Sequence, residues 1–339
     1  MHLQTLSEGS VAYACSGNFA SGGVARRAAN LRGQSIIEYV LIIAVIGLVI
    51  VFAGPGVAGA IRNQFNLVGN TVNNGTVCGV EGGGASGGGS AGADSATVQA
   101  AVAKEAKDWT LDEQKAVADD IAKNGTSSLA YAKAKAAMDA GTKWSIKLTN
   151  GKTMEYHIIG INHDNVADGS GKAGITFETS TSINSYQMNA TNTNAGGWEK
   201  SELRAKMNSG EVWNLMPSDF QSKVKTVTKL TNNVGDGKTN VDVSSTSDKL
   251  FLLSDTEIWS RKSYGVNQME GYQYEFYASK GVTDTNWSGA SNGWGHRTRT
   301  PNTSPYGVDT KNFGGVDYDG NTTNYKAAEK INTFIAFCF

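Results

Sequence analysis

The chain has 339 residues, with 30 Lys and Arg against 31 Asp and Glu, a formal net charge of -1 and a pI near 6.4. This balance gives no overall field that would attract a polyanion, which argues against nucleic-acid binding through bulk charge. The apolar content of 40% is sufficient for a sizeable core, and three Cys in so long a chain exclude a disulfide-dense scaffold.

An apolar segment near the N-terminus is the most distinctive feature of the sequence. No charged side chain occurs between Tyr39 and Ile61, and Glu38 is the only charged residue from Ile36 to Ala53. At 1.5 Å per residue, a helix over this run would cross roughly 30 Å of hydrocarbon. We therefore expect a long hydrophobic α-helix within residues 34–78 that anchors the chain in a membrane.

Glu38 is an unusual residue for such a segment, because a carboxylate inside an apolar run is costly unless a cation accompanies it. A free α-amino group on Gln34 would supply that cation if the chain were cut after Gly33. Residues 1–33 are polar, and three arginines stand close to the apolar run. Cations on that flank predict a cytoplasmic N-terminus.

The residues around this position resemble the prepilin motif of Flp-type pilins, which are tight-adherence, or class IVb, type IV pilins. Gly33 precedes the cut, Glu38 and Tyr39 are the fifth and sixth residues after it, and the apolar run follows. The resemblance covers roughly residues 26–72. It implies that a prepilin peptidase removes a leader over residues 1–33, that the apolar segment becomes the filament core, and that Glu38 and Tyr39 act in assembly. Methylation of the new N-terminus is left open.

Two features depart from that family or compete with the proposed cut. The mature chain would have 306 residues (339 minus 33), whereas Flp pilins are very small, so it resembles a minor pilin or pseudopilin as much as a bulk subunit. In addition, the small residue Ala53 before Gly54-Pro55-Gly56 is similar to a signal-peptidase site. The alternatives are therefore a secreted protein that begins at Gly54 and an uncleaved membrane anchor.

A flexible linker and a helical collar are expected next. Residues 79–94 are almost wholly Gly, Ser and Ala, which predicts a flexible tether. The tract matches the G-x-S-x-G pattern twice, but neither match follows a strand or opens a helix, so we assign no catalytic serine. Residues 95–140 are Ala-rich and charged and predict three helices, with a capping box formed by Thr110 and Glu113.

Residues 141–339 change to strand-like patterns and predict an α+β head with short strands and long loops. Asn150-Gly151 between two alternating runs predicts a hairpin. The apolar end of the chain predicts an internal strand rather than a loose tail. The expected elements are strands over 144–148, 154–161, 174–179, 250–253, 272–277 and 333–339, and helices over 201–208 and 219–229.

The head also resembles an uncharacterised domain that recurs in surface and secreted proteins of Gram-positive bacteria. The resemblance rests partly on Trp198, Ser201 and Arg204, which form a W-x-x-S-x-x-R pattern, and on late Trp- and Arg-containing loops before a closing apolar strand. This pattern is similar to C-type-lectin-like folds. Likeness of fold does not transfer function.

No motif in the sequence indicates catalysis, and we expect no enzymatic activity. The four His residues lack a metal-binding spacing, and there is no Walker loop. We therefore assign no catalytic residue, metal ligand or cofactor. Calcium remains an alternative, because Asp164, Asp168, Asp317 and Asp319 lie in Asp-rich loops that offer oxygen ligands.

Ligand binding is expected in a late loop of the head. Trp287 and Trp294 lie among Asn, Ser and Gly residues and close to Arg297, and such aromatic and polar groups suit a sugar or protein ligand. The alternative is that these tryptophans anchor their own loop. After removal of the leader, Cys78 and Cys338 remain outside the membrane, where a disulfide between them would persist.

These features predict a subunit of a Flp/Tad-like type IV pilus. It would reside in the cytoplasmic membrane before assembly and on the cell surface afterwards. Its expected partners are copies of itself, the prepilin peptidase, the pilus assembly machinery and a host or matrix ligand, with no nucleic acid. The alternative is a membrane-anchored or secreted surface binding module that forms no filament.

Overall fold

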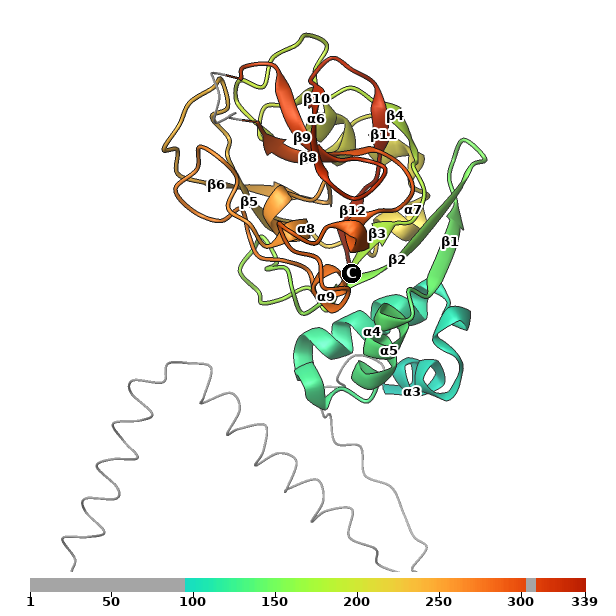
Figure 1. Ribbon diagram of the computed structural model, residues 1–339. Helices are drawn as coiled ribbons and strands as arrows, with labels where there is room; N and C mark the ends of the chain where they lie inside the picture. The colour runs from blue at the N-terminus through green and yellow to red at the C-terminus, as the bar shows by residue number, and fades with distance from the viewer. Residues whose placement is uncertain (1–94, 303–308) are drawn as a thin grey trace, which may run out of the picture. The chain divides into compact units, whose positions relative to one another are not determined.

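A computed structural model describes residues 95–302 and 309–339 (Figure 1). The leader, the pilin-like segment over 34–78 and the linker over 79–94 lie outside these residues, as do Gly33, Gln34, Glu38 and Tyr39. The described part combines a helical collar with a head built on two sheets, so helices and strands are mixed along the chain.

The expected fold class needs a correction in its first element. In the part of the chain that the structure describes, every helix is too short or too polar to span a bilayer, and α4 (Leu111–Asn124) has only 14 residues. A long N-terminal hydrophobic helix is therefore not supported as an element of this fold. The apolar composition of residues 34–78 suggested that helix, and these residues lie outside the part of the chain that the structure describes.

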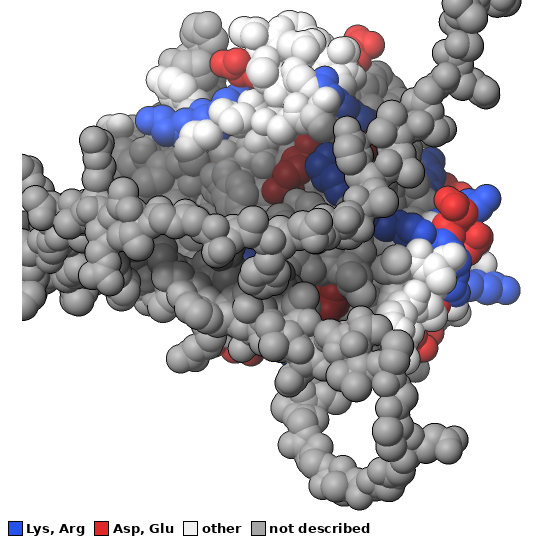
Figure 2. Space-filling model, turned by 90° about the horizontal axis from the view of Figure 1, so that it is seen from below, with Lys and Arg blue, Asp and Glu red and all other residues white. Residues whose placement is uncertain are grey.

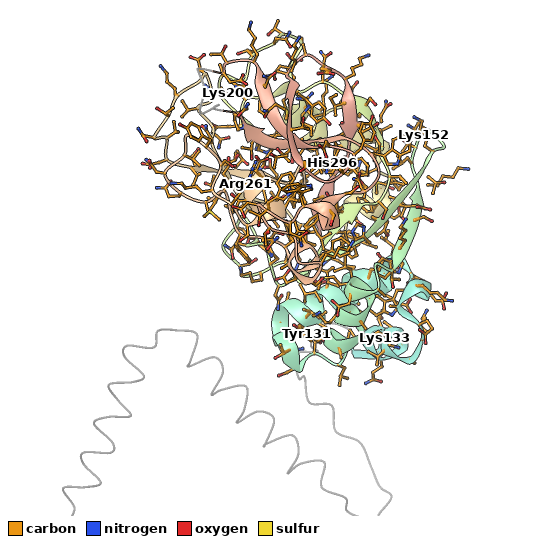
Figure 3. All side chains as sticks on the ribbon, in the orientation of Figure 1. Tyr131, Lys133, Lys152, Lys200, Arg261 and His296 are labelled. Carbon is orange, nitrogen blue, oxygen red and sulfur yellow. The ribbon has the colours of Figure 1, made fainter. Side chains whose placement is uncertain are left out.

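The collar consists of short helices that stand at the start of the described chain (Figure 1). They are α3 (Ser95–Ala103), η1 (Ala106–Asp108), α4, η2 (Gly125–Ser127) and α5 (Tyr131–Asp139). Thr110 and Glu113 form the predicted capping box of α4, in which each side chain bonds the other residue's backbone N–H. Lys133 of α5, labelled in Figure 3, donates to the carbonyl oxygens of Val102 and Lys104 and so closes the end of α3.

Sheet A lies in the core of the head, and helices α4 and α5 of the collar pack against its strands. Its order is β1-β2-β3-β12-β7, and adjacent strands pair antiparallel. The bounds are β1 (Lys143–Lys147), β2 (Thr153–Ile161), β3 (Ile175–Thr179), β12 (Ala336–Cys338) and β7 (Leu250–Phe251). The Asn150-Gly151 turn joins β1 to β2, with Gly151 at φ 84°. As predicted, the last strand is internal, because β12 lies between β3 and β7.

The second sheet is built mainly from the last third of the chain. Its order is β10-β9-β8-β11-β4. The bounds are β4 (Asn184–Tyr186), β8 (His296–Pro301), β9 (Asn312–Val316), β10 (Thr322–Lys326) and β11 (Ile331–Thr333). Most of these residues were predicted as loops, because their Asn, Gly and Thr content hides the alternation of a strand. A separate pair is formed by β5 (Val227–Thr231) and β6 (Ser244–Asp248).

Short helices connect the strands of the head. They are α6 (Glu202–Asn208), η3 (Trp213–Leu215), α7 (Ser218–Gln221), α8 (Asp255–Trp259), α9 (Glu275–Ser279) and η4 (Ser288–Ala290). Two predictions were wrong here. The expected helix over 219–229 is the single turn α7 followed by strand β5, and the expected strand over 272–277 contains the start of helix α9. The first segment pairs with β6, and the second packs against β2, so tertiary partners override the local pattern in both places.

The W-x-x-S-x-x-R pattern has a structural role at Asp248. The Trp198 indole donates to Asp248 Oδ2 at 2.9 Å, and Arg204 Nε donates to Oδ1 at 2.6 Å. Ser201 is the N-cap of α6 and accepts from the backbone N–H of Arg204. Trp198 and Arg204 therefore hold the fully buried carboxylate of Asp248, and Ser201 caps the helix that carries Arg204. A buried charge is stable only when it is paired.

A second buried network ties the strands and helices of the head together. Lys229 Nζ lies 2.6 Å from Asp164 Oδ1 and 2.5 Å from Glu257 Oε1. Arg299 forms a bidentate pair with Glu257 at 2.5 and 3.0 Å. Burial alone would raise the pKa of Asp164, but Lys229 outweighs it and holds that pKa below its ordinary value. Two cations thus neutralise two carboxylates out of contact with water.

Candidate functional site

A pocket with acidic, basic and aromatic side chains lies where the collar meets sheet A and helix α9. It has a volume of about 240 Å³ and is open to solvent on one side. Strands β2 and β3 supply its floor, α9 supplies one wall, and η4 with the residues after it supplies another. Its lining residues are Gly141, Lys143, His157, Glu178, Thr179, Ser180, Phe276, Tyr277, Lys280, Gly289, Ala290, Ser291 and Asn292.

Glu178 is the carboxyl group of this pocket. It sits on β3, opposite His157 of β2, and its side chain is buried. The Tyr277 hydroxyl donates to its Oε2 at 2.6 Å, whereas Oε1 has no hydrogen-bond partner among the described residues. Burial, with a smaller contribution from the negative charge of Glu257, raises the pKa of Glu178 to about 7. The carboxyl is therefore about half protonated at neutral pH.

His157 stands beside Glu178 as a neutral ring. Its Nδ1 lies 3.0 Å from Ser180 Oγ, and its Nε2 is buried without a partner among the described residues. The ring is 4.6 Å from the ring of Phe276. Burial, followed by the charges of Lys280 and Lys143, lowers the pKa of His157 to about 4. The imidazole is consequently uncharged at physiological pH.

Two lysines bring positive charge to the pocket. Lys280 Nζ lies 3.9 Å above the ring centroid of Phe276, a cation–π contact that holds the end of its flexible stem. Lys143 is exposed and lies 3.8 Å from Glu155. The charges of both lysines disfavour protonation of His157, so both lysines influence the electrostatics of the same pocket. With His157 neutral and Lys143 beside Glu155, Lys280 is the cation of this pocket that has no ion pair within the described structure.

Glu178→Gln is expected to remove a pH dependence of stability. The pKa of Glu178 is raised from 4.5 to about 7, so the folded state binds more protons than the unfolded state between these values. The stability that this carboxyl contributes is complete below pH 4.5 and is lost as the pH rises to about 7. Relative to that of the wild type, the free energy of unfolding of the variant should therefore increase by on the order of 3 kcal/mol between pH 4.5 and pH 8.

The measurement is urea unfolding of both proteins at pH 4.5 and pH 8. His157 and His296 have pKa values of about 4 and act in the opposite direction, since their stability contribution is lost as the pH falls from 6.5 to 4. Both histidines are present in both proteins, so their effect cancels when the two free energies of unfolding are subtracted. If the free energies of unfolding of the two proteins differ by the same amount at pH 4.5 and pH 8, the expectation is contradicted.

The loop with the predicted ligand-binding residues borders this pocket. Ser291 and Asn292 line it, while Trp287 and Trp294 of the same loop are 39% and 57% exposed. The Asn292 amide lies 3.2 Å from Nδ1 of His296, which Figure 3 labels in strand β8. The two tryptophans therefore remain available at the surface, on a loop that is tied to the second sheet.

Arg297, the third residue expected in the ligand site, lies elsewhere. It is buried, and its guanidinium donates to three backbone carbonyls within residues 325–329. It holds the turn after β10 against β8, and the structure does not bring it to the surface with Trp287 and Trp294. An Arg in a loop-like sequence suggests ligand binding, but backbone carbonyls at a sheet edge need donors equally.

The residues considered for calcium and for a disulfide are also separated. Asp164 is buried and bound to Lys229, whereas Asp168 is exposed and bonds the backbone N–H of Ser170. Among the described residues, no group of three or more His, Cys, Asp or Glu side chains is arranged to hold a metal ion. Asp317 and Asp319 belong to one turn, in which Asp317 Oδ1 accepts from the backbone N–H of Asp319.

Cys338 is a buried thiol in the centre of sheet A. Its Sγ lies 3.3 Å from Thr176 Oγ1, and burial raises its pKa well above the ordinary value. Cys78 lies outside the described residues, so the expected disulfide remains a prediction. The burial of Cys338 means that a bond to the tether would require part of sheet A to open.

Sequence reasoning missed Glu178, Tyr277 and Lys280, which define the pocket. One signal was available: Glu178 is the only charged residue in an otherwise apolar and Thr-containing strand that is buried along its whole length. A carboxyl in such a strand needs a partner or a solvent opening. Tyr277 carried no such signal, because its segment was interpreted as a strand and its contact with Glu178 joins residues 99 positions apart.

The charged side chains elsewhere do not form a field of one sign. Figure 2 shows Lys and Arg beside Asp and Glu on the described part of one face. Charges of opposite sign also pair on successive turns of the collar helices, where Lys115 contacts Asp119 and Lys135 contacts Asp139. Lys280 in the pocket, which has no ion pair within the described structure, therefore contrasts with these paired charges on the collar.

Comparison with known proteins gives one match. Residues 170–333 are similar to a family described as a domain of unknown function, DUF6273. The match includes β3, α9 and the residues of the loop that line the pocket, and it leaves out the collar, β1 and β2. No curated protein and no solved structure matches the chain.

Proposed function

We propose that this chain is a subunit of a Flp/Tad-like type IV pilus whose head binds a small polar ligand. The observation that supports binding is the pocket at Glu178, because rigid strands and a helix hold a half-protonated carboxyl, two lysines and an aromatic wall around one opening. In this proposal the collar and the linker present the head to the surroundings of the cell, where binding contributes to adhesion.

The assembly half of the proposal rests on the sequence around the cut. A prepilin peptidase would cleave between Gly33 and Gln34 at the cytoplasmic membrane. The carboxylate of Glu38 would then pair with the new α-amino group of Gln34 in the same or a neighbouring subunit, and Tyr39 would pack beside it. Apolar residues 39–61 would associate with copies of the chain through the assembly machinery, since burial of each CH₂ contributes about 0.8 kcal/mol.

Glu38→Ala is expected to leave cleavage after Gly33 intact and to abolish incorporation into filaments. The physical reason is that the apolar segment would still be inserted, but the α-amino group would lose its counter-ion in the assembled core. N-terminal sequencing of the membrane fraction reports cleavage, and immunoblotting of sheared filaments reports incorporation. Glu8→Ala is the matched control, because Glu8 is removed with the leader and should have no effect on filaments.

Two results would overturn the assembly proposal. Normal filaments in the Glu38→Ala strain would mean that the carboxylate has no role in assembly. A mature N-terminus at Gly54 would instead favour a secreted binding module that forms no filament, and an uncut chain would favour a membrane-anchored one. Neither of these results bears on ligand binding by the head, which is tested separately below.

A further inference from the structure

We propose that the pocket at Glu178 takes a small organic acid of the size of one sugar ring, with the acid's carboxylate beside Lys280 and Lys143 and a hydrogen bond from the Glu178 carboxyl. This inference rests on the proposed binding function of the head and adds the class of ligand. A uronic acid, which is a sugar ring with one carboxylate, has the required chemistry.

The charges of the pocket favour an anion. Lys280 and Lys143 line the same pocket, and both lower the pKa of His157. Lys280 has no hydrogen bond to a protein group in the described structure, and the ring of Phe276 below it positions its ammonium without neutralising it. A carboxylate placed beside Lys280 would form a charge-assisted pair at little cost in side-chain ordering.

Glu178 can serve as a donor to such an anion. Its Oε2 already accepts a hydrogen bond from the Tyr277 hydroxyl, and Oε1 has no hydrogen bond to another described residue. A protonated carboxyl donates one hydrogen bond, and a buried carboxylic acid that remains neutral near pH 7 is a known way to bind an anionic oxygen. The ionised form would repel the same ligand, so binding of the acid should be coupled to uptake of a proton.

The groups that face Glu178 set the direction of the pH effect. His157 from β2 is neutral above pH 4, and Tyr277 from α9 remains a donor because its pKa is raised well above 10. Glu257 of α8 adds a negative charge at longer range and Lys280 a positive one. Glu178 is thus the group with a pKa near neutrality in this set, and affinity for an acid should fall as it ionises.

The size of the pocket limits the ligand. A volume of about 240 Å³ lies just below the usual range of about 300–1,000 Å³ for drug-sized ligands. One six-membered sugar ring with a carboxylate suits this volume, whereas a longer chain would extend past the rim. The exposed tryptophans of the neighbouring loop, Trp287 and Trp294, provide aromatic surface for such an extension.

The test uses three compounds that share one ring and differ in charge. Isothermal titration calorimetry of the full chain in detergent would compare glucuronate, glucose and glucosamine at pH 6 and pH 8. Glucuronate should bind at least about tenfold more tightly than glucose at pH 6, and glucosamine should bind most weakly. Glucuronate affinity should fall about tenfold between pH 6 and pH 8, because the protonated fraction of a group with a pKa near 7 falls from about 0.9 to about 0.1.

Two variants separate the roles of the residues. Glu178→Gln keeps a neutral donor at both pH values, so it should retain glucuronate binding and lose the pH dependence. Lys280→Met keeps the apolar stem over Phe276 and should weaken binding at least about tenfold. Lys152→Met, at the tip of the β1–β2 hairpin in Figure 3 and outside the pocket, should leave binding unchanged.

The outcomes distinguish this inference from the function on which it rests. Glucose or glucosamine binding as tightly as glucuronate, or glucuronate affinity that rises with pH, would overturn the ligand class while leaving a binding head. Failure of all three compounds to bind a chain with a cooperative unfolding transition would overturn both the ligand class and the binding function. If the glucuronate affinity of the wild type is the same at pH 6 and pH 8, Glu178 is excluded as the donor.

Discussion

Replacing Lys229 with Met is expected to lower the free energy of unfolding of the head by about 3–5 kcal/mol. Lys229 is 2% exposed and bridges Asp164 and Glu257, which are themselves buried. Met has a similar length and fills the space, so the loss would come from charge rather than from a cavity. Arg299 would still balance Glu257. Asp164 would be left as a carboxylate without its Lys229 partner, with hydrogen bonds from the Thr176 and Tyr274 hydroxyls and the Cys338 thiol.

Urea unfolding at pH 7 measures this effect. The matched control is Lys135→Met, because Lys135 also pairs with a carboxylate, Asp139, at 2.6 Å, but on an exposed helix surface. That pair is expected to contribute only about 0.3–0.5 kcal/mol. Similar losses in the two variants would show that burial of the network has no special role. Because an ion pair can often be replaced as a whole, a variant with both Lys229→Met and Asp164→Leu should recover part of the stability.

Gly174→Ala is expected to destabilise the head by about 3 kcal/mol, through a clash between the collar and sheet A. Gly174 immediately precedes β3, and a Cβ atom there would overlap the backbone carbonyl oxygen of Ala118 in helix α4. Ala118 is fully buried in the middle of that helix, so its carbonyl cannot move unless the helix moves. The expected result is a lower midpoint of urea unfolding with weaker attachment of α4 to the sheet.

Gly151→Ala provides the control for this substitution. Gly151 lies in the β1–β2 turn at φ 84°, where a Cβ atom would meet nothing within 4 Å. Its replacement therefore carries only the backbone cost of a left-handed conformation, about 1 kcal/mol. Hydrogen exchange of α4 should increase in Gly174→Ala and not in Gly151→Ala. Equal losses of stability and equal exchange would mean that close approach of α4 to β3 is not needed.

Part of the fold follows from local sequence. Thr110 and Glu113 form a capping box because an N-cap hydroxyl and an N3 carboxylate satisfy each other's backbone N–H groups, whatever surrounds them. The β1–β2 turn follows from Asn150-Gly151, since Gly tolerates the required positive φ. Such interactions join residues within a few positions of one another, so a single sequence contains all the information that they need.

Other segments were misinterpreted because their conformation depends on distant partners. Residues 219–229 were expected to form one helix, but Val227–Thr231 is a strand that pairs with β6 and places Lys229 in the buried network. Residues 272–277 were expected to form a strand, but Glu275–Ser279 forms helix α9, which brings Tyr277 to Glu178. In both segments, pairing and burial outweigh a local propensity of less than about 1 kcal/mol per residue.

The sequence by itself determined the apolar segment with Glu38 and Gly33, the Gly/Ser tract, the caps, the hairpin turn and the internal position of the last strand, since each depends on composition, spacing or neighbouring residues. Only the tertiary structure decided that Arg297 supports a turn and that Asp164 is a member of an ion network. It also decided that Glu178, Tyr277 and Lys280 share one pocket with a loop that contains two exposed tryptophans. The reason is that burial and charge at these positions depend on partners 28, 65 and 99 residues away, for Arg297, Asp164 and Glu178 respectively. Such partners set whether a carboxyl is ionised, paired or available to a ligand.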